Sequence, residues 1–144
     1  MSELTLDVAR KILDAALAKA VEKKLKPLVI TVLDTRGCVK ASAAQDGTSL
    51  MRGEIAHGKA YGALAMGMGS RALFQRAQEQ AYFISSVNTL AQGRMVPVPG
   101  GVLIRAADGS VVGAVGISGD ASEKDEDCAV HGITAAGLKP DTGD

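Results

Sequence analysis

The sequence predicts an α+β protein built around an antiparallel sheet. Its segments of helical and strand pattern follow one another in the order α-β-β-α-α-β-β-α, so the strands come in adjacent pairs. A short turn that contains glycine separates the two strands of each pair, which is typical of a β-hairpin. The 144 residues, of which 47% are hydrophobic, suffice for one core. We therefore expect a single domain over residues 1–144.

The first half of the chain reads as a helix, a hairpin and a second helix. Apolar residues at helical spacing predict a helix over residues 5–25, with Thr5 placed to cap it and Pro27 to stop it. A buried β-branched strand, a turn and a returning strand follow at residues 28–33, 34–37 and 38–44. The second helix is predicted over residues 48–66.

Three glycines interrupt that second helix, at Gly53, Gly58 and Gly62. Each costs roughly 1 kcal/mol relative to alanine, so a face that retains all three should press against another backbone. We expect burial within one copy to be insufficient to account for such a face. We therefore predict a homo-oligomer with this helix or the 70–91 region at the interface.

The second half of the chain contains two short helices, a second hairpin and a final helix. Ser70 is placed to cap the first of the helices predicted over residues 71–79 and 81–91. One further short strand is expected within 93–98, before the hairpin strands at 101–105 and 110–118. The last helix opens at Ser122 with Asp125 in the capping-box position and ends before Gly137, and residues 141–144 read as a frayed tail.

Charge and composition argue against several classes of partner. Lys and Arg total 16 and Asp and Glu total 16, which leaves no basic field to attract nucleic acid. Only 3% of residues are aromatic, which leaves little for stacking on bases. No apolar run reaches the roughly 18–20 residues of a membrane span, and the N-terminus lacks a signal-peptide pattern. We expect a cytoplasmic protein with no nucleic-acid or membrane partner.

The candidate catalytic residues lie on one stripe of the 48–66 helix. They are Glu54 and His57, and they share that stripe with Tyr61, a candidate ligand-binding residue. Glu54 can accept a hydrogen bond from one imidazole nitrogen, which leaves the other free as a base or a metal ligand. Two interpretations remain open: an ion pair on the helix surface, or an axial ligand or general base in a pocket.

Other candidate ligand-binding residues lie elsewhere. Arg52 and Lys59 occupy the opposite stripe of the same helix, so they reach the imidazole only from its far side or across a subunit interface. Gly100 and Gly101 permit close approach of a ligand, and Gly119 leads to a helix N-terminus whose N–H groups can hold an anion.

The last helix offers less chemistry. Cys128 and His131 share a face, but a closed zinc site would need all four Cys and His residues of the chain, so we expect none. His131 reads as an exposed or interface residue. The acidic residues at the start of this helix read as a solvated face that the helix dipole favours: Glu123, Asp125, Glu126 and Asp127.

Five segments occur in the order found in one protein family. They are VLDTRG at 32–37, IA and KA at 55–56 and 59–60, VPVPGGV at 96–102, GSVVGAVGISG at 109–119, and DE at 125–126. Together they resemble the GlcG/HbpS-like haem-binding or haem-degrading domain, which also occurs as the C-terminal domain of PduO-type corrinoid adenosyltransferases. The resemblance implies a profilin-like α/β/α fold with a five-stranded antiparallel sheet, and oligomers of up to eight copies.

Three functions follow from these features. The first is haem or tetrapyrrole binding with His57 as the axial metal ligand, in an apolar pocket near three methionines, Met51, Met66 and Met68. The alternative is a small catabolic enzyme of the proton-transfer, isomerase, lyase or hydrolase type that acts on an organic acid. In it His57, oriented by Glu54, would be the acid or base, and backbone N–H groups at Gly100 and Gly101 or at the helix start at 119–122 would hold a carboxylate or enolate. The third is a structural oligomer without a ligand.

Overall fold

A computed structural model describes residues 3–144 of the chain and confirms the α+β class. It contains five helices: α1 (Leu6–Glu22), α2 (Arg52–Met66), α3 (Ser70–Glu79), α4 (Ala81–Leu90) and α5 (Ser122–Ala135). Its five strands are β1 (Val29–Asp34), β2 (Val39–Ala44), β3 (Gly101–Arg105), β4 (Val111–Ser118) and β5 (Lys139–Asp141). All strand pairs are antiparallel, in the order β2-β1-β4-β3-β5.

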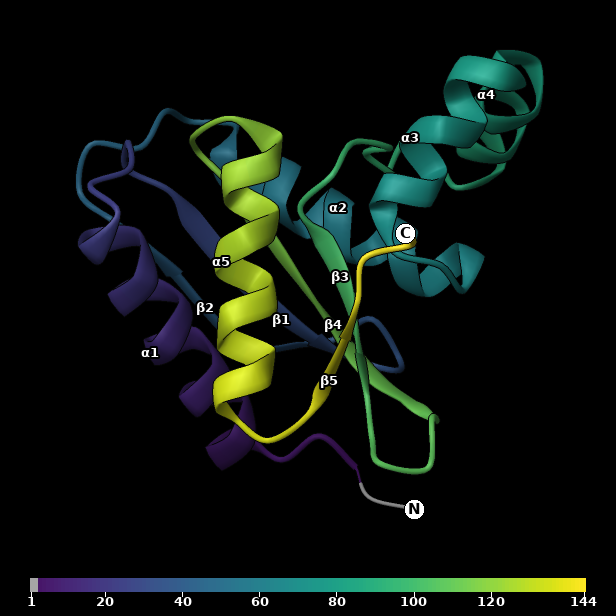
Figure 1. Cartoon of the computed structure of the whole chain (residues 1–144). Coiled ribbons are helices and arrows are strands. Elements are labelled where there is room, and N and C mark those ends of the chain that lie inside the picture. The colour runs from purple at the N-terminus through teal and green to yellow at the C-terminus, as the bar shows by residue number, and fades with distance from the viewer. Residues whose placement is uncertain (1–2) are drawn as a thin grey trace.

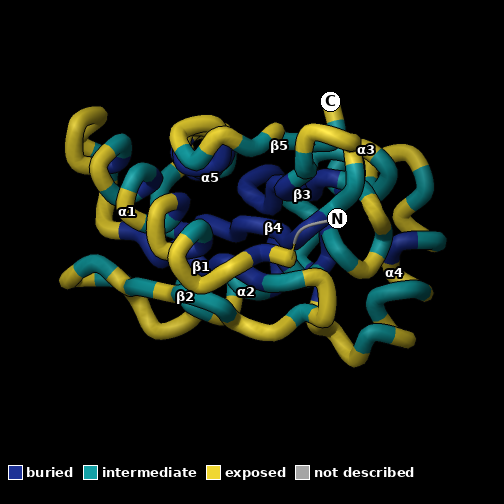
Figure 2. The backbone as a smooth tube through the Cα atoms, turned by 90° about the horizontal axis from the view of Figure 1, so that it is seen from below, coloured by how far each residue is buried: buried dark blue, intermediate teal, exposed yellow. Residues whose placement is uncertain are grey.

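The sheet lies between two layers of helices. Helices α1 and α5 pack against each other on one face, and α2 packs on β1, β3 and β4 on the other (Figures 1 and 2). Among residues 3–144, no helix is both long and apolar enough to cross a membrane.

Aliphatic side chains fill the core on both faces of the sheet. The α1 and α5 face holds the larger cluster, which includes Ile12, Ile117 and Ile133. The α2 face holds a smaller one, which includes Leu33 and Leu103. The buried part of the chain in Figure 2 follows the central strands, as the β-branched runs of the sequence predict.

The structure corrects the prediction for the fifth strand and the C-terminal tail. The expected strand within 93–98 is absent from that segment, and the fifth strand is instead β5, paired with β3. The residues after β5 are held as well, because the Thr142 carbonyl accepts a hydrogen bond from the Arg71 amide. Pro140 is tolerated in β5 because β5 is an edge strand.

Two predicted helix caps are also wrong. Ser70 is the first residue of α3 and fully buried, and its Oγ accepts a hydrogen bond from the Gly101 amide at 2.7 Å. Helix α5 has Ala121 as its N-cap residue, with no capping side chain. Helix α2 begins at Arg52 rather than at residue 48.

Two of the three glycines of α2 are explained within one copy of the chain. A side chain at Gly58 would meet Val96 at 2.5 Å, and one at Gly62 would meet Leu73 at 3.2 Å. Gly53 has nothing within 4 Å. The glycines are therefore not evidence for an oligomer, which stays a prediction without that support.

Helices α3 and α4 form a hairpin at one end of the molecule, and α4 lies away from the sheet (Figure 1). Ile84 is the one buried residue of α4. Tyr82 and Leu90 are 71% and 83% exposed. The hairpin and the 91–99 segment that follows it bound the grooves described next.

Candidate functional site

Helix α2 divides the candidate residues between two places. Glu54, His57 and Tyr61 lie on its outer side, whereas Lys59 is 2% exposed and points past the sheet toward α5. Arg52 donates a hydrogen bond to Ser118 at the end of β4. This division follows from the helical period that placed the residues on opposite stripes.

A groove of about 530 Å³ runs along the outer side of α2 beside His57. It is lined by residues of the α2 N-terminus and of the segment after α4: Met51, Gly53, Glu54, Ile55, His57, Gln92, Gly93, Arg94 and Val96. The Val96 amide donates to the Gly58 carbonyl at 3.1 Å, which fixes this segment against the helix. Gly58 permits the contact because it carries no side chain. The volume of the groove is within the usual range of small-molecule sites.

An aromatic and cationic array borders the groove. The His57 and Tyr61 rings stack with centroids 6.4 Å apart and planes 15° apart. The Arg94 guanidinium lies 4.7 Å from the centre of the Tyr61 ring, and its Nε donates to the Ala91 carbonyl. The imidazole therefore sits at the groove wall with a fixed positive charge nearby.

Glu54 lines the groove but does not orient the imidazole in this structure. Among residues 3–144, no hydrogen bond joins Glu54 to His57. Of the three methionines noted in the sequence, Met51 lines the groove, whereas Met66 is the last residue of α2 and Met68 follows the end of the helix. Arg94 was missed because it precedes the motif at 96–102, and no local pattern in the sequence places its segment against α2.

The groove offers a donor set that fits haem. Imidazole and thioether groups are among the side chains that hold haem iron in proteins, and His57 and Met51 both line this groove. Ile55 and Val96 add apolar surface for a macrocycle. Arg94 supplies a partner for a carboxylate.

The inner side of α2 holds a buried ion pair. Lys59 Nζ donates to the Ile117 carbonyl at 2.9 Å and to Asp125 Oδ2 at 3.2 Å. Burial lowers the pKa of Lys59 and raises the pKa of Asp125, and the opposite charge of each partner counters that effect. Asp125 Oδ1 also accepts from the Asp120 amide, so both charged groups have partners within their own chain.

A second ion pair lies near the first. The Arg71 guanidinium contacts both carboxylate oxygens of Glu126, at 2.8–3.2 Å. This hydrogen bond raises the pKa of Arg71. The expectation of a solvated acidic face is wrong for Asp125 and Glu126, which are 1% and 8% exposed.

The glycines singled out from the sequence approach other parts of the chain. A side chain at Gly100 would lie 2.8 Å from Lys59 Nζ, and the Gly101 amide already donates to Ser70. Gly119 packs on the backbone of residues 27–28. Close approach is therefore needed here for packing, and the Gly101 amide is not free to hold a carboxylate.

The cysteines and His131 lie apart from the groove. Cys128 is fully buried, which raises the pKa of its thiol to about 11. His131 and Cys38 are exposed. Within residues 3–144, no three or more His, Cys, Asp or Glu side chains are arranged to hold a metal ion.

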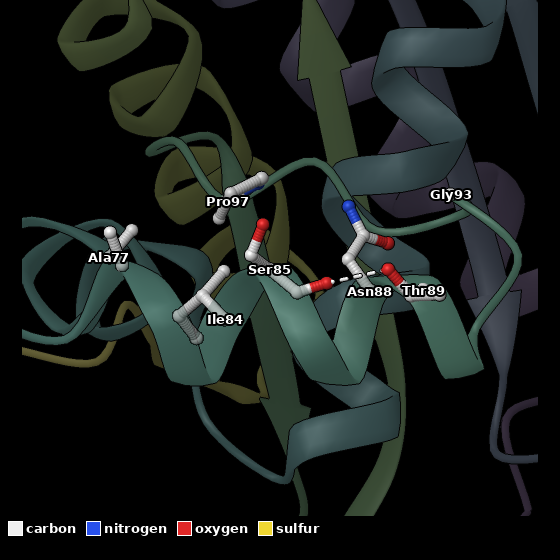
Figure 3. A pocket seen from close by; sticks show the side chains of 8 residues that line it. Ala77, Ile84, Ser85, Asn88, Thr89, Gly93 and Pro97 are labelled. Carbon is white, nitrogen blue, oxygen red and sulfur yellow. Dashed lines mark hydrogen bonds between the residues drawn. The ribbon is translucent and has the colours of Figure 1, made fainter.

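A second groove, of about 430 Å³, lies between the α3–α4 hairpin and the segment that follows it (Figure 3). Asn88 ties α4 to this segment, because its amide group both donates to and accepts from the Met95 backbone, at 2.9 and 3.0 Å. The Thr89 hydroxyl donates a hydrogen bond to the Ser85 carbonyl. Gly93 lines both grooves, so the two adjoin.

Comparison with known proteins identifies relatives over most of the chain. Residues 4–134 match the family described as haem-degrading protein HbpS-like. An uncharacterized 15.0 kDa protein of Citrobacter freundii, from the dhaT-dhaS intergenic region, is 32% identical over 127 residues, which cover 87% of this chain and 86% of that protein. The corrinoid adenosyltransferase PduO of the same organism is 30% identical over 125 residues, which cover 87% of this chain but 36% of PduO.

Solved structures share the fold. The PduOC:heme complex has a TM-score of 0.85 and 27% identity, with 95% of this chain and 97% of the other covered. HbpS has a TM-score of 0.79 and 24% identity, with 93% and 90% covered. The family match spans nearly all of the chain, and a relative of similar length agrees with it. The chain therefore belongs to the HbpS-like family.

Proposed function

We propose that the chain binds haem or a related tetrapyrrole in the groove beside His57. The observation that carries this proposal is a half-buried imidazole at the wall of a groove of about 530 Å³ that also presents apolar side chains. The HbpS-like family and the similarity to a PduO domain solved with heme support it.

Three residues at or beside the groove have distinct roles in this proposal. His57 would supply a neutral imidazole nitrogen as the axial ligand, and stacking on Tyr61 would hold the ring in place. Arg94 would pair with a carboxylate of the porphyrin edge. A bound haem would supply redox-active iron whose properties depend on the axial ligand.

The alternative of a catabolic enzyme has less support. It relies on Glu54 to orient His57 and on free amides at Gly100 and Gly101 or at the helix start at 119–122. At that helix start, the Asp120 amide donates to Asp125 and the Ala121 amide donates to the Asp120 side chain. Glu54 is not bonded to His57 among the described residues, and the Gly101 amide is bonded to Ser70. We therefore favour binding of a tetrapyrrole over proton transfer on an organic acid.

Titration of the purified protein with haemin tests the proposal. We expect a shifted Soret band that saturates with the wild-type protein and is lost, or weakened by more than tenfold, in His57→Ala. His131→Ala is the matched control, because His131 is exposed on α5, on the other side of the sheet. Thermal unfolding of both variants would establish that each is folded. Equal binding by His57→Ala and the wild type would refute the assignment.

A further inference from the structure

We propose that two copies of this chain associate through their β2 strands, which pair antiparallel across a twofold axis and join the two sheets into one. The partner is a second copy of the chain. No residue of β2 lines the His57 groove, so this proposal does not depend on haem binding.

The β2 edge of the sheet is open. β2 is the terminal strand of the sheet and has 6 residues, whereas the opposite edge, β5, has 3. Short edge strands resist pairing with other chains, and long ones present unpaired backbone groups to them. Within the described residues, β2 pairs with β1 on one side alone.

The hydrogen bonds to β1 show which groups of β2 face outward. The Gln45 amide donates to the Leu28 carbonyl at 3.0 Å, so the backbone groups of Ala43 and Ala41 also turn toward β1. Ser42 and Ala44, which alternate with them, therefore direct their N–H and C=O groups away from the sheet. These are the groups that a further strand would bond.

An apolar groove follows this edge. It measures about 580 Å³ and lies between the end of α1 and the end of β2, lined by Leu17, Val21, Leu25, Pro27, Ala43, Ala44, Gln45 and Asp46. Val21 is 67% exposed. A strand added to β2 would therefore have apolar surface beside it as well as free backbone groups.

Two unpaired charges select one register. Lys40 lies near the start of β2 and Asp46 just after its end, and neither forms an ion pair within residues 3–144. In an antiparallel pair with Ala43 on the twofold axis, Lys40 of each copy faces Asp46 of the other. Ser42 then faces Ala44, so the outward backbone groups also meet. A shift that puts Ser42 on the axis would place Lys40 opposite Ala44 and leave both charges unpaired.

The same register brings the apolar grooves of the two copies together. Ala43 lines the groove, so a twofold axis through it makes the grooves continuous. The exposed Val21 of each copy can then pack into their common space. The small side chains of residues 41–44 allow the two strands to approach.

A cysteine crosslink tests this register directly. The variants are made with Cys38→Ser, which removes the exposed native thiol. Ala43 would form a non-hydrogen-bonded pair with its symmetry mate, whose Cα separation of about 4.5 Å lies within disulfide range. We expect Ala43→Cys to form a covalent dimer under mild oxidation. Ala41→Cys is the matched control, because in this register residue 41 lies four residues away from residue 41 of the other copy. This variant should run as a monomer on a non-reducing gel.

A charge exchange gives a second readout that does not depend on the new cysteine. Lys40→Glu and Asp46→Lys should each raise the dimer dissociation constant, measured by sedimentation, by roughly tenfold, and the double variant should restore it. Crosslinking of Ala43→Cys no faster than of Ala41→Cys would overturn the proposal. So would a wild-type protein that sediments as a 14.7 kDa monomer at all concentrations, or a dimer that both single charge variants leave unchanged.

Discussion

Lys59 Nζ and Asp125 Oδ2 lie 3.2 Å apart and join α2 to α5, two helices that cover opposite faces of the sheet. Their side chains are 3% and 1% exposed. Lys59 passes the end of β4 beside Gly100, where a side chain would collide with it. Glycine at that position and the buried lysine are therefore parts of one arrangement.

Loss of one partner of this pair should destabilise the fold strongly. Lys59→Met leaves the Asp125 carboxylate buried without its cation, which typically costs about 3–5 kcal/mol. The double variant Lys59→Met/Asp125→Leu removes both charges and should recover much of that loss. Urea unfolding measures the free energies. Lys11→Met breaks an exposed pair with Asp7 and should change stability by less than about 1 kcal/mol.

The sequence predicted the features that depend on local pattern. Both hairpins, the helices and the shared stripe of His57 and Tyr61 followed from residue periodicity. The Lys59–Asp125 pair joins residues 66 apart, and local spacing says nothing about which elements meet at that distance. Arg94 reaches the site from a loop, and β5 is three residues long and contains proline. Neither feature has a residue periodicity from which it could have been predicted.

Two glycines of α2 should respond to alanine in opposite directions. Gly58→Ala places a methyl group against Val96, so the segment that walls the groove must shift, at a cost of about 1–3 kcal/mol. Gly53→Ala meets nothing within 4 Å and should stabilise the helix by up to about 1 kcal/mol. Thermal unfolding of the two variants compares them. Equal effects would show that Val96 does not rest on Gly58.

Burial of Cys128 should make stability fall at alkaline pH. Its pKa rises from 9.0 to about 11 on folding. Below pH 9 both states hold the proton, and between the two pKa values the folded state alone retains it. The free energy of unfolding therefore falls as pH rises through this window, by up to roughly 3 kcal/mol. Other groups titrate there too, so the measurement is the difference between the wild type and Cys128→Ala.

Thiol labelling provides a check at neutral pH. The exposed Cys38 should react with a thiol reagent in the native protein, and Cys128 should react after unfolding. Two reactive thiols in the native protein would contradict the burial of Cys128.

Arg94 should contribute to haem affinity by its charge. Its guanidinium is fixed at the groove by the Tyr61 ring and the Ala91 carbonyl, so it is positioned before a ligand arrives. A hydrogen bond to a charged group contributes about 1.5–3 kcal/mol, which corresponds to roughly 10–100-fold in affinity. We expect Arg94→Gln to weaken haemin binding by that factor, and the wild type to lose affinity at high salt more than the variant does.

The control for this experiment is Arg10→Gln, which removes an exposed arginine from α1, on the other side of the sheet. It should bind haemin like the wild type. The comparison also separates two roles of the groove, because His57→Ala should remove the axial-ligand signature of the spectrum whereas Arg94→Gln should keep it and change only the affinity. If Arg94→Gln bound as tightly as the wild type at low salt, the porphyrin carboxylates would have to lie away from this residue, and the orientation proposed for the ligand would be wrong.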